Sequence, residues 1–83
     1  MKVKRRNGKV EDFIREKIVV AVVKAGGNIK TARDIASEIE SEFGRRDTVT
    51  TEEIRSAVLK KLETRDSKTY DSWIRFDKEK KGK

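Results

Sequence analysis

The chain has 83 residues, which allows one domain with a modest core. It contains no Cys and no His, which excludes disulfides, thiolate metal sites, and the commonest metal ligand and general base. No apolar run approaches the roughly 20 residues that span a bilayer, so we expect a cytoplasmic protein without a membrane segment. A charged fraction of 45% is typical of a thermophile.

The net charge of +7 is concentrated at the two ends of the chain. Residues 1–9 carry five cations and no acid, whereas residues 10–76 carry equal numbers of basic and acidic side chains. Residues 77–83 contribute the remaining +2. A polyanionic partner would therefore contact the two ends of the chain.

A β-hairpin is predicted over residues 2–13. Its centre is Asn7-Gly8, and both of these residues tolerate the positive φ angles of a type I′ turn. The alternation of a strand places Val3 and Arg5 on the same face.

Two amphipathic helices are predicted next. The first covers residues 15–25 and ends at Gly26-Gly27, and its apolar stripe consists of Ile18, Val19, Val22 and Ala25. The second starts at residue 30 or 31 and ends before Gly44. Its inward residues follow helical spacing: Ala32, Ile35, Ala36, Ile39 and Phe43.

The second half of the chain predicts two further helices. Residues 47–49 are compatible with a short third strand. Thr50 and Glu53 form a capping box, which starts a helix that ends near Leu62 and turns inward Ile54, Ala57, Val58 and Leu62. A polar loop over 64–68 leads to a last helix over 69–80, whose apolar residues, assigned mostly to the core, are Tyr70, Trp73, Ile74 and Phe76.

The predicted fold is mainly α with a small β part. It is a four-helix bundle capped by an N-terminal β-hairpin or a small three-stranded sheet. We expect one domain over residues 1–80 and a basic C-terminal tail over 81–83.

Three groups of residues suggest an anionic ligand, and each has a simpler explanation. The basic hairpin can hold phosphates, or it can be a solvated edge that resists aggregation. Glu11 and Lys17 can meet a ribose and a phosphate, or they can neutralise each other. Thr51 and Arg55 lie at a helix start that suits an anion, although plain capping with a surface Arg is the simpler and better explanation on the sequence alone. No phosphate loop or dinucleotide motif is present in the sequence, and nothing supports enzymatic activity.

Taken together, these segments resemble the ATP-cone, a family of small nucleotide-binding regulatory domains. The similarity begins with an apolar residue, a basic pair, Asn-Gly, Glu and Lys-Ile in the order Val3-x-Arg5-Arg6-Asn7-Gly8-x-Val10-Glu11-x-Phe13-x-x-x-Lys17-Ile18. It continues before the third helix with Val49-Thr50-Thr51-Glu52-Glu53-Ile54. The aromatic, basic segment from Tyr70 to Lys80 is similar to the closing helix of the family, so the resemblance covers nearly the whole chain.

The resemblance implies a free-standing ATP-cone that binds ATP or dATP, with or without Mg²⁺, and is not an enzyme. It would signal through a homo-oligomer or a protein partner in trans. The resemblance assigns the adenine to Val3, Phe13, Ile14 and Ile18. It assigns the ribose to Glu11, and the phosphates to Arg5, Arg6, Lys17, Thr51 and Arg55. Two departures are visible: Asp77 stands where the family often has Arg, and Arg55 where some members have His.

The alternative is a small basic nucleic-acid-binding protein, such as a nucleotide-gated transcription regulator. Its basic head would contact backbone phosphates, with an affinity that falls steeply in salt. No helix with clustered Arg or Lys is evident that would read a groove, because the cations gather at the hairpin and the tail.

Overall fold

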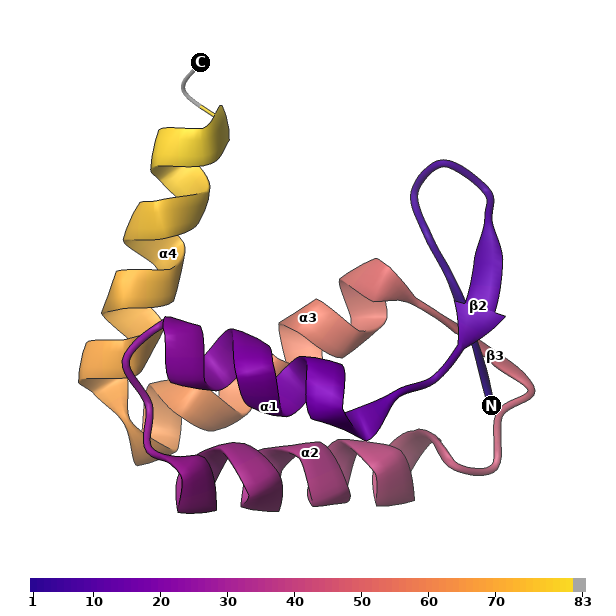
Figure 1. The fold of residues 1–83 in the computed structure, drawn as a ribbon, viewed down its shortest axis with the longest axis horizontal. Coiled ribbons are helices and arrows are strands. Elements are labelled where there is room, and N and C mark those ends of the chain that lie inside the picture. The colour runs from indigo at the N-terminus through magenta and orange to yellow at the C-terminus, as the bar shows by residue number, and fades with distance from the viewer. Residues whose placement is uncertain (82–83) are drawn as a thin grey trace.

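Four helices and a three-stranded sheet make up the fold (Figure 1). The computed structural model describes residues 1–81, with side chains described up to Lys78. The elements in chain order are β1 (Lys2–Lys4), β2 (Val10–Asp12), α1 (Arg15–Lys24), α2 (Ile29–Phe43), β3 (Thr48–Thr50), α3 (Thr51–Arg65) and α4 (Ser67–Lys81). The predicted fold class, mainly helical with a small sheet at the N-terminus, is confirmed. Of the basic tail expected at 81–83, residue 81 is the last residue of α4, and residues 82–83 lie outside the described residues.

The sheet has the order β2-β1-β3, so the first strand of the chain is its central strand. β1 pairs with β2 in antiparallel register, with Val3 opposite Glu11, and with β3 in parallel register, with Val3 opposite Val49. The parallel pairing needs a long crossover, which α1 and α2 supply. Val3 and Val49 are both buried, so one face of the sheet is turned toward the helices.

The hairpin turn differs from the predicted type I′ turn. Gly8 has a φ of +88°, but Asn7 does not have a positive φ. The Arg5 N–H donates to the Lys9 carbonyl at 2.8 Å and the Gly8 N–H to the Arg5 carbonyl at 2.9 Å, which defines a three-residue loop with Gly in the left-handed position. Asn7 contributes through its side chain, which accepts a hydrogen bond from the Lys9 N–H at 3.0 Å. This bond stabilises the longer loop.

The turn between α1 and α2 depends on two consecutive glycines. Gly26 has a φ of +109°, and its N–H donates to the Val23 carbonyl at 3.0 Å. The Gly27 N–H donates to the Val22 carbonyl at 3.0 Å, which completes a Schellman motif. Gly27 is buried, and a Cβ atom there would lie 2.7 Å from a methyl group of Val22. The glycine pair therefore ends α1 as predicted.

α2 begins at Ile29, slightly earlier than predicted, because Asn28 caps it. The Asn28 side chain accepts a hydrogen bond from the Thr31 N–H at 2.8 Å. The capping box predicted at the start of α3 is present: the Glu53 N–H donates to Thr50 Oγ1 at 3.1 Å, and the Thr50 N–H donates to Glu53 Oε1 at 3.0 Å.

The polar loop predicted over residues 64–68 is wrong. α3 continues to Arg65, and Asp66 alone separates it from α4. Asp66 makes this tight junction because its carboxylate accepts hydrogen bonds from the Thr69 N–H at 3.2 Å and the Thr69 hydroxyl at 2.5 Å. Thr69 is only 2% exposed, and it lies beside Gly27 of the α1–α2 turn. The start of α4 is therefore anchored to the body of the domain.

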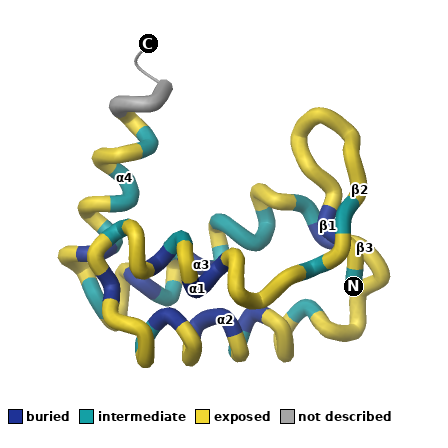
Figure 2. Tube along the Cα trace, viewed as in Figure 1, coloured by how far each residue is buried: buried dark blue, intermediate teal, exposed yellow. Residues whose placement is uncertain are grey.

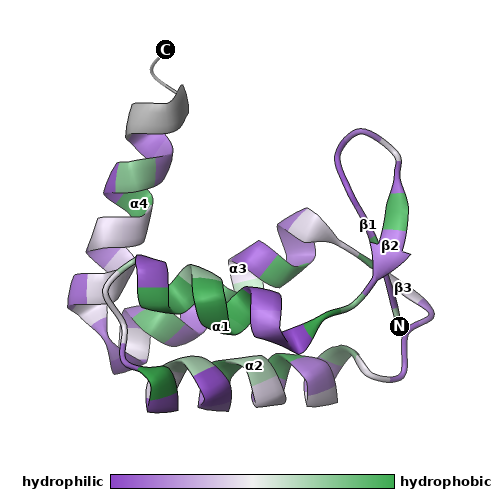
Figure 3. Cartoon of the chain, in the orientation of Figure 1, coloured by the Kyte–Doolittle hydropathy of each residue, from purple (hydrophilic) through white to green (hydrophobic). Residues whose placement is uncertain are grey.

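The hydrophobic core lies between α1, α2 and α3 (Figures 2 and 3). Its buried members are Ile18, Val19, Val22, Ala32, Ile35, Ala36, Ile39, Val58 and Leu62. α4 packs against α3 and then extends away from the other helices (Figure 1). For this reason Tyr70 and Trp73 reach the core, whereas Phe76 is 62% exposed and its assignment to the core is wrong. No helix in the described part of the chain is both long and apolar enough to cross a bilayer.

Candidate functional site

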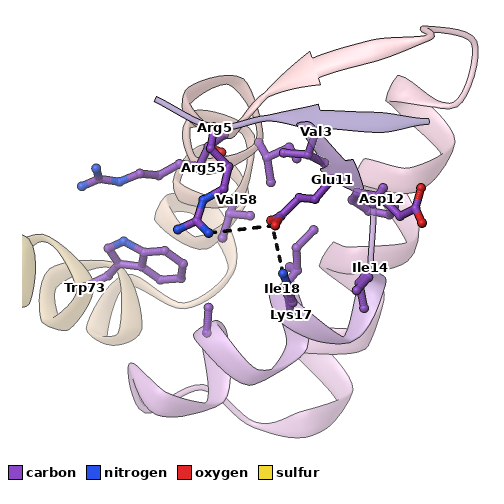
Figure 4. Close-up of a pocket in the computed structure, with 14 residues that line it drawn as sticks. Val3, Arg5, Glu11, Asp12, Ile14, Lys17, Ile18, Arg55, Val58 and Trp73 are labelled. Atoms are coloured by element: carbon purple, nitrogen blue, oxygen red, sulfur yellow. Dashed lines mark hydrogen bonds and ion pairs between the residues drawn. The ribbon is translucent and has the colours of Figure 1, made fainter. Parts of the chain in front are cut away.

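A pocket of about 320 Å³ opens where the sheet, α1, α3 and α4 meet (Figure 4). Its apolar wall is continuous with the core. Val3 of β1, Ile18 of α1 and Val58 of α3 are buried there, and Trp73 of α4 closes one side. Phe13 and Ile14, in the link between β2 and α1, complete the lining near the sheet, and Ile14 is 48% exposed.

Two cations stand at the rim of this pocket, and one carboxylate joins them. Lys17 Nζ lies 3.2 Å from Glu11 Oε1, and Arg5 Nη1 lies 3.9 Å from Glu11 Oε2 (Figure 4). The Arg5 and Lys17 side chains are 56% and 60% exposed. Ion pairs this exposed are weak, so an anionic ligand can replace them at little cost.

The first turn of α3 forms the third side of the rim. The Thr51 hydroxyl donates to the Lys4 carbonyl at 3.4 Å, which ties the start of α3 to β1. Helix N-termini present unpaired N–H groups and a partial positive charge. Arg55 follows one turn later and lines the pocket, and its guanidinium forms an ion pair with Asp77 of α4.

Nine of the ten residues predicted for the site line this single pocket. They come from distant parts of the chain: Val3, Arg5, Glu11, Phe13, Ile14, Lys17, Ile18, Thr51 and Arg55. The exception is Arg6, which lies outside the lining, is 73% exposed and forms an ion pair with Glu52 at 2.8 Å.

Sequence reasoning missed five lining residues: Asp12, Ala21, Ile54, Val58 and Trp73. Ile54, Val58 and Trp73 had been assigned to the core, which they also contact. Helical spacing marks a residue as inward-facing, but it does not distinguish a packed wall from a pocket wall. Trp73 has this double role because it packs against the core and also lines the pocket.

Neighbouring acidic side chains offset much of the positive charge of the basic hairpin. Lys2 pairs with Asp12, and the resulting hydrogen bond lowers the pKa of the Asp12 carboxyl. Arg5 pairs with Glu11 and Arg6 with Glu52. Three of the five hairpin cations are therefore engaged within the described residues.

Glu53, at the start of α3, is held in its charged form. Its hydrogen bonds from Arg46, and then from the Thr50 backbone, lower its pKa to about 2. The capping box therefore stays intact at neutral pH. The Glu53 carboxylate is thus occupied by Arg46 and the cap, and Glu53 is not among the residues that line the pocket.

An apolar pocket with a cationic rim, built at the junction of a small sheet and a helix N-terminus, defines a small ligand-binding domain. The family model of the ATP cone domain matches residues 1–81, and the chain belongs to this family. No curated protein matches the chain. ATP-cone domains bind ATP and dATP, and membership implies a nucleotide-binding, regulatory function rather than a catalytic one.

Proposed function

We propose that the pocket between β1, α1 and α3 is the nucleotide site of this ATP-cone, and that the chain regulates a partner or its own assembly by binding ATP or dATP there. The observation that supports this is the meeting of an apolar wall and a cationic rim in one pocket of about 320 Å³. That volume is within the range of small-molecule sites.

The adenine is assigned to the apolar end, between Val3 and Ile18. The segment Phe13–Ile14 lies at its edge, and two of its backbone groups are engaged: the Phe13 N–H donates to the Met1 carbonyl, and the Ile14 carbonyl accepts from the Lys17 N–H, both at 3.1 Å. The carbonyl of Phe13 and the N–H of Ile14 have no backbone partner among the described residues. These two groups belong to one peptide and point in opposite directions. We assign one of them to a hydrogen bond with the edge of the adenine.

Glu11 is assigned to the ribose. A carboxylate repels phosphates but accepts hydrogen bonds from hydroxyl groups. Because Glu11 lies between Arg5 and Lys17, a ribose there would place its phosphates next to both cations. This arrangement also orders the ligand, with the base at the apolar end and the phosphates at the rim.

The phosphates are assigned to Arg5, Lys17 and Arg55, with the first turn of α3 at Thr51. Arg6 remains a predicted phosphate contact, and it would have to exchange Glu52 for the ligand. Mg²⁺ would arrive with the phosphates, because a small hard cation is usually held by substrate phosphates and water.

The test is calorimetric titration of the chain with ATP, dATP, ADP and GTP, with and without Mg²⁺. We expect adenine-specific binding in the micromolar range. The variant R5A/K17A removes two rim cations, and we expect it to abolish measurable ATP binding while leaving the helical circular dichroism unchanged.

The matched control is K4A/K9A. It removes the same amount of charge, in this case from the hairpin alone, but neither residue lines the pocket, so it should bind ATP like the unmodified chain. Full affinity in R5A/K17A would refute the site. Equal loss in both variants would show that general charge, rather than this pocket, attracts the nucleotide.

Nucleic-acid binding has less support than nucleotide binding. The predicted basic head is largely compensated, since Lys2, Arg5 and Arg6 pair with acids. A gel shift over a salt series tests this alternative, because backbone contacts release counterions and the affinity falls steeply with salt. Binding of a duplex or single strand at low salt that R5A/K17A retains would favour it.

A further inference from the structure

Asp77 of α4 forms an ion pair with Arg55, the cation that α3 contributes to the pocket lining. Its carboxylate pairs with the guanidinium of Arg55. The two side chains are 22% and 26% exposed, so this pair is more shielded from water than the pairs that Arg5 and Lys17 form at the rim. In Figure 4 the Arg55 side chain extends toward α4, away from Lys17. Arg55 is thus a pocket residue whose charge is already used by another element.

The paired oxygen of Asp77 is closed to solvent. Asp77 Oδ2 has essentially no accessible surface, and it is the atom that faces the Arg55 guanidinium. A carboxylate oxygen in this state is stable only while its cation stays in place, because an unpaired charge that water cannot reach is strongly unfavourable. Loss of Arg55 would therefore leave this oxygen unpaired and favour a shift of this end of α4 that exposes Oδ2 to water.

Trp73 connects this ion pair to the pocket. It lies one turn before Asp77 on α4, so the two side chains share a helix face. Trp73 lines the pocket, and with Asp77 it also lines a second hollow of about 470 Å³ between α1 and α4. A shift of α4 at Asp77 would therefore change the pocket wall.

We propose that Asp77 is an internal competitor for the anion-binding position at Arg55, and that an incoming phosphate displaces it and releases the outer part of α4. This inference rests on the proposed nucleotide site and adds its regulation. The chemistry of the exchange is balanced, since one oxyanion replaces another on the same guanidinium. A phosphate offers several acceptor oxygens and more charge than one carboxylate, and it matches the forked donors of Arg.

Two consequences follow from thermodynamic linkage. Asp77 lowers the affinity for the ligand, because part of the binding free energy is spent on breaking its ion pair. Conversely, a partner that holds α4 in its paired position lowers the affinity further, and one that binds released α4 raises it. Asp77 is in this sense an affinity-setting residue outside the pocket.

The first experiment is a double-mutant cycle read by calorimetric titration with ATP. The variant D77N keeps the shape of the side chain but removes its charge, and we expect it to bind ATP about fivefold more tightly or better. In the R55Q background the same change should alter affinity by less than about twofold. The control D71N removes one negative charge from an exposed site on the same helix, and it should bind ATP with the same affinity as the unmodified chain.

The second experiment needs no change at Asp77. Inorganic tripolyphosphate carries the charge of the ligand without a base that could stack on or quench an indole. We expect its titration to shift the fluorescence of Trp73, the single Trp of the chain, and to leave the R55Q variant unshifted. Competition against ATP shows when the site is saturated.

The outcomes separate the two proposals. ATP binding that D77N and D71N affect equally, or a gain in D77N that persists with R55Q, overturns the competition while the nucleotide site stands. Unchanged Trp73 fluorescence at saturating tripolyphosphate overturns the release of α4. If neither the unmodified chain nor D77N binds ATP, the proposed site itself is wrong and this inference is lost with it.

Discussion

Lys17 Nζ lies 3.2 Å from Glu11 Oε1, so the first turn of α1 is joined to β2 across the mouth of the pocket. Arg5 reaches the other oxygen of the same carboxylate. One acid therefore positions two cations that come from different elements. If the ribose and phosphate assignments are correct, this acid has opposite effects on two kinds of ligand.

We predict that Glu11→Gln weakens ATP binding and strengthens tripolyphosphate binding. The substitution removes the charged acceptor for the ribose hydroxyls, which should cost about tenfold in ATP affinity. It also removes a negative charge beside the phosphates, which favours the inorganic anion. Calorimetric titration with each ligand measures these two opposite changes in affinity. The control Glu16→Gln changes an acid that lies beside Lys17 in the first turn of α1 but pairs with Arg33 instead, and it should affect neither ligand. Changes of the same sign for both ligands would contradict the ribose assignment.

We predict that the chain loses stability in acid between about pH 4.5 and pH 2. Hydrogen bonds from Arg65 and then Lys61 lower the pKa of Glu38 to about 2, and Arg46 lowers that of Glu53 to about 2. Since their usual pKa is near 4.5, both contribute stability above that pH, and this contribution is lost as pH falls toward the folded-state values.

Thermal unfolding followed from pH 6 to pH 2 measures this loss. The variant E38Q/E53Q should be less stable at pH 6 and should depend less on pH. Glu63→Gln is the control, because Glu63 forms no ion pair within the described residues. An unchanged pH profile in E38Q/E53Q would show that other groups control the acid transition.

We predict that Gly27→Ala destabilises the domain by about 1–3 kcal/mol through crowding. The new Cβ atom would lie 2.7 Å from a Val22 methyl and 3.4 Å from a methyl of Thr69, where α1, α2 and α4 meet. Gly8→Ala is the comparison: its φ is +88°, but a Cβ atom there has no neighbour within 4 Å, so only backbone strain contributes. Chemical denaturation gives both values, and an unaffected Gly27→Ala would mean that the turn relaxes freely.

We predict that Asp66→Ala lowers the melting temperature by about 4–8 °C. The variant loses the carboxylate that accepts two hydrogen bonds from Thr69, and it leaves the buried Thr69 hydroxyl without this partner. Asp71→Ala, at an exposed site of α4, should change the melting temperature by less than half as much. A weaker ATP affinity in Asp66→Ala would additionally show that the anchoring of α4 influences the pocket.

Helix positions and the capping box could be predicted from the sequence because they depend on neighbouring residues. The Thr50–Glu53 box and the Gly26-Gly27 end of α1 involve contacts within a few residues, and both are present. The loop predicted at 64–68 was wrong because its polar composition is also that of an exposed helix, and Asp66 supplies the only break.

The candidate site was predictable as a set of residues, but its assembly was not. The motif from Val3 to Ile18 and the segment around Thr51 meet only because β1 pairs with β3, a contact over more than 40 residues. The pairing of Arg55 with Asp77 was invisible for the same reason, since an ion pair between two helices has no signature in the spacing of either. Sequence reasoning identified Asp77 only as a departure from the family.

The central position of β1 has a consequence for the order of folding. β1 contains the third residue of the chain, yet its parallel partner, β3, begins at Thr48. A growing chain can form the β1–β2 hairpin and α1 early, but the sheet closes only after β3 has been made. Thr51 and Arg55, which follow β3 directly, then complete the rim. The pocket is therefore a late product of folding, and a nascent chain that has not reached α3 should not bind the ligand.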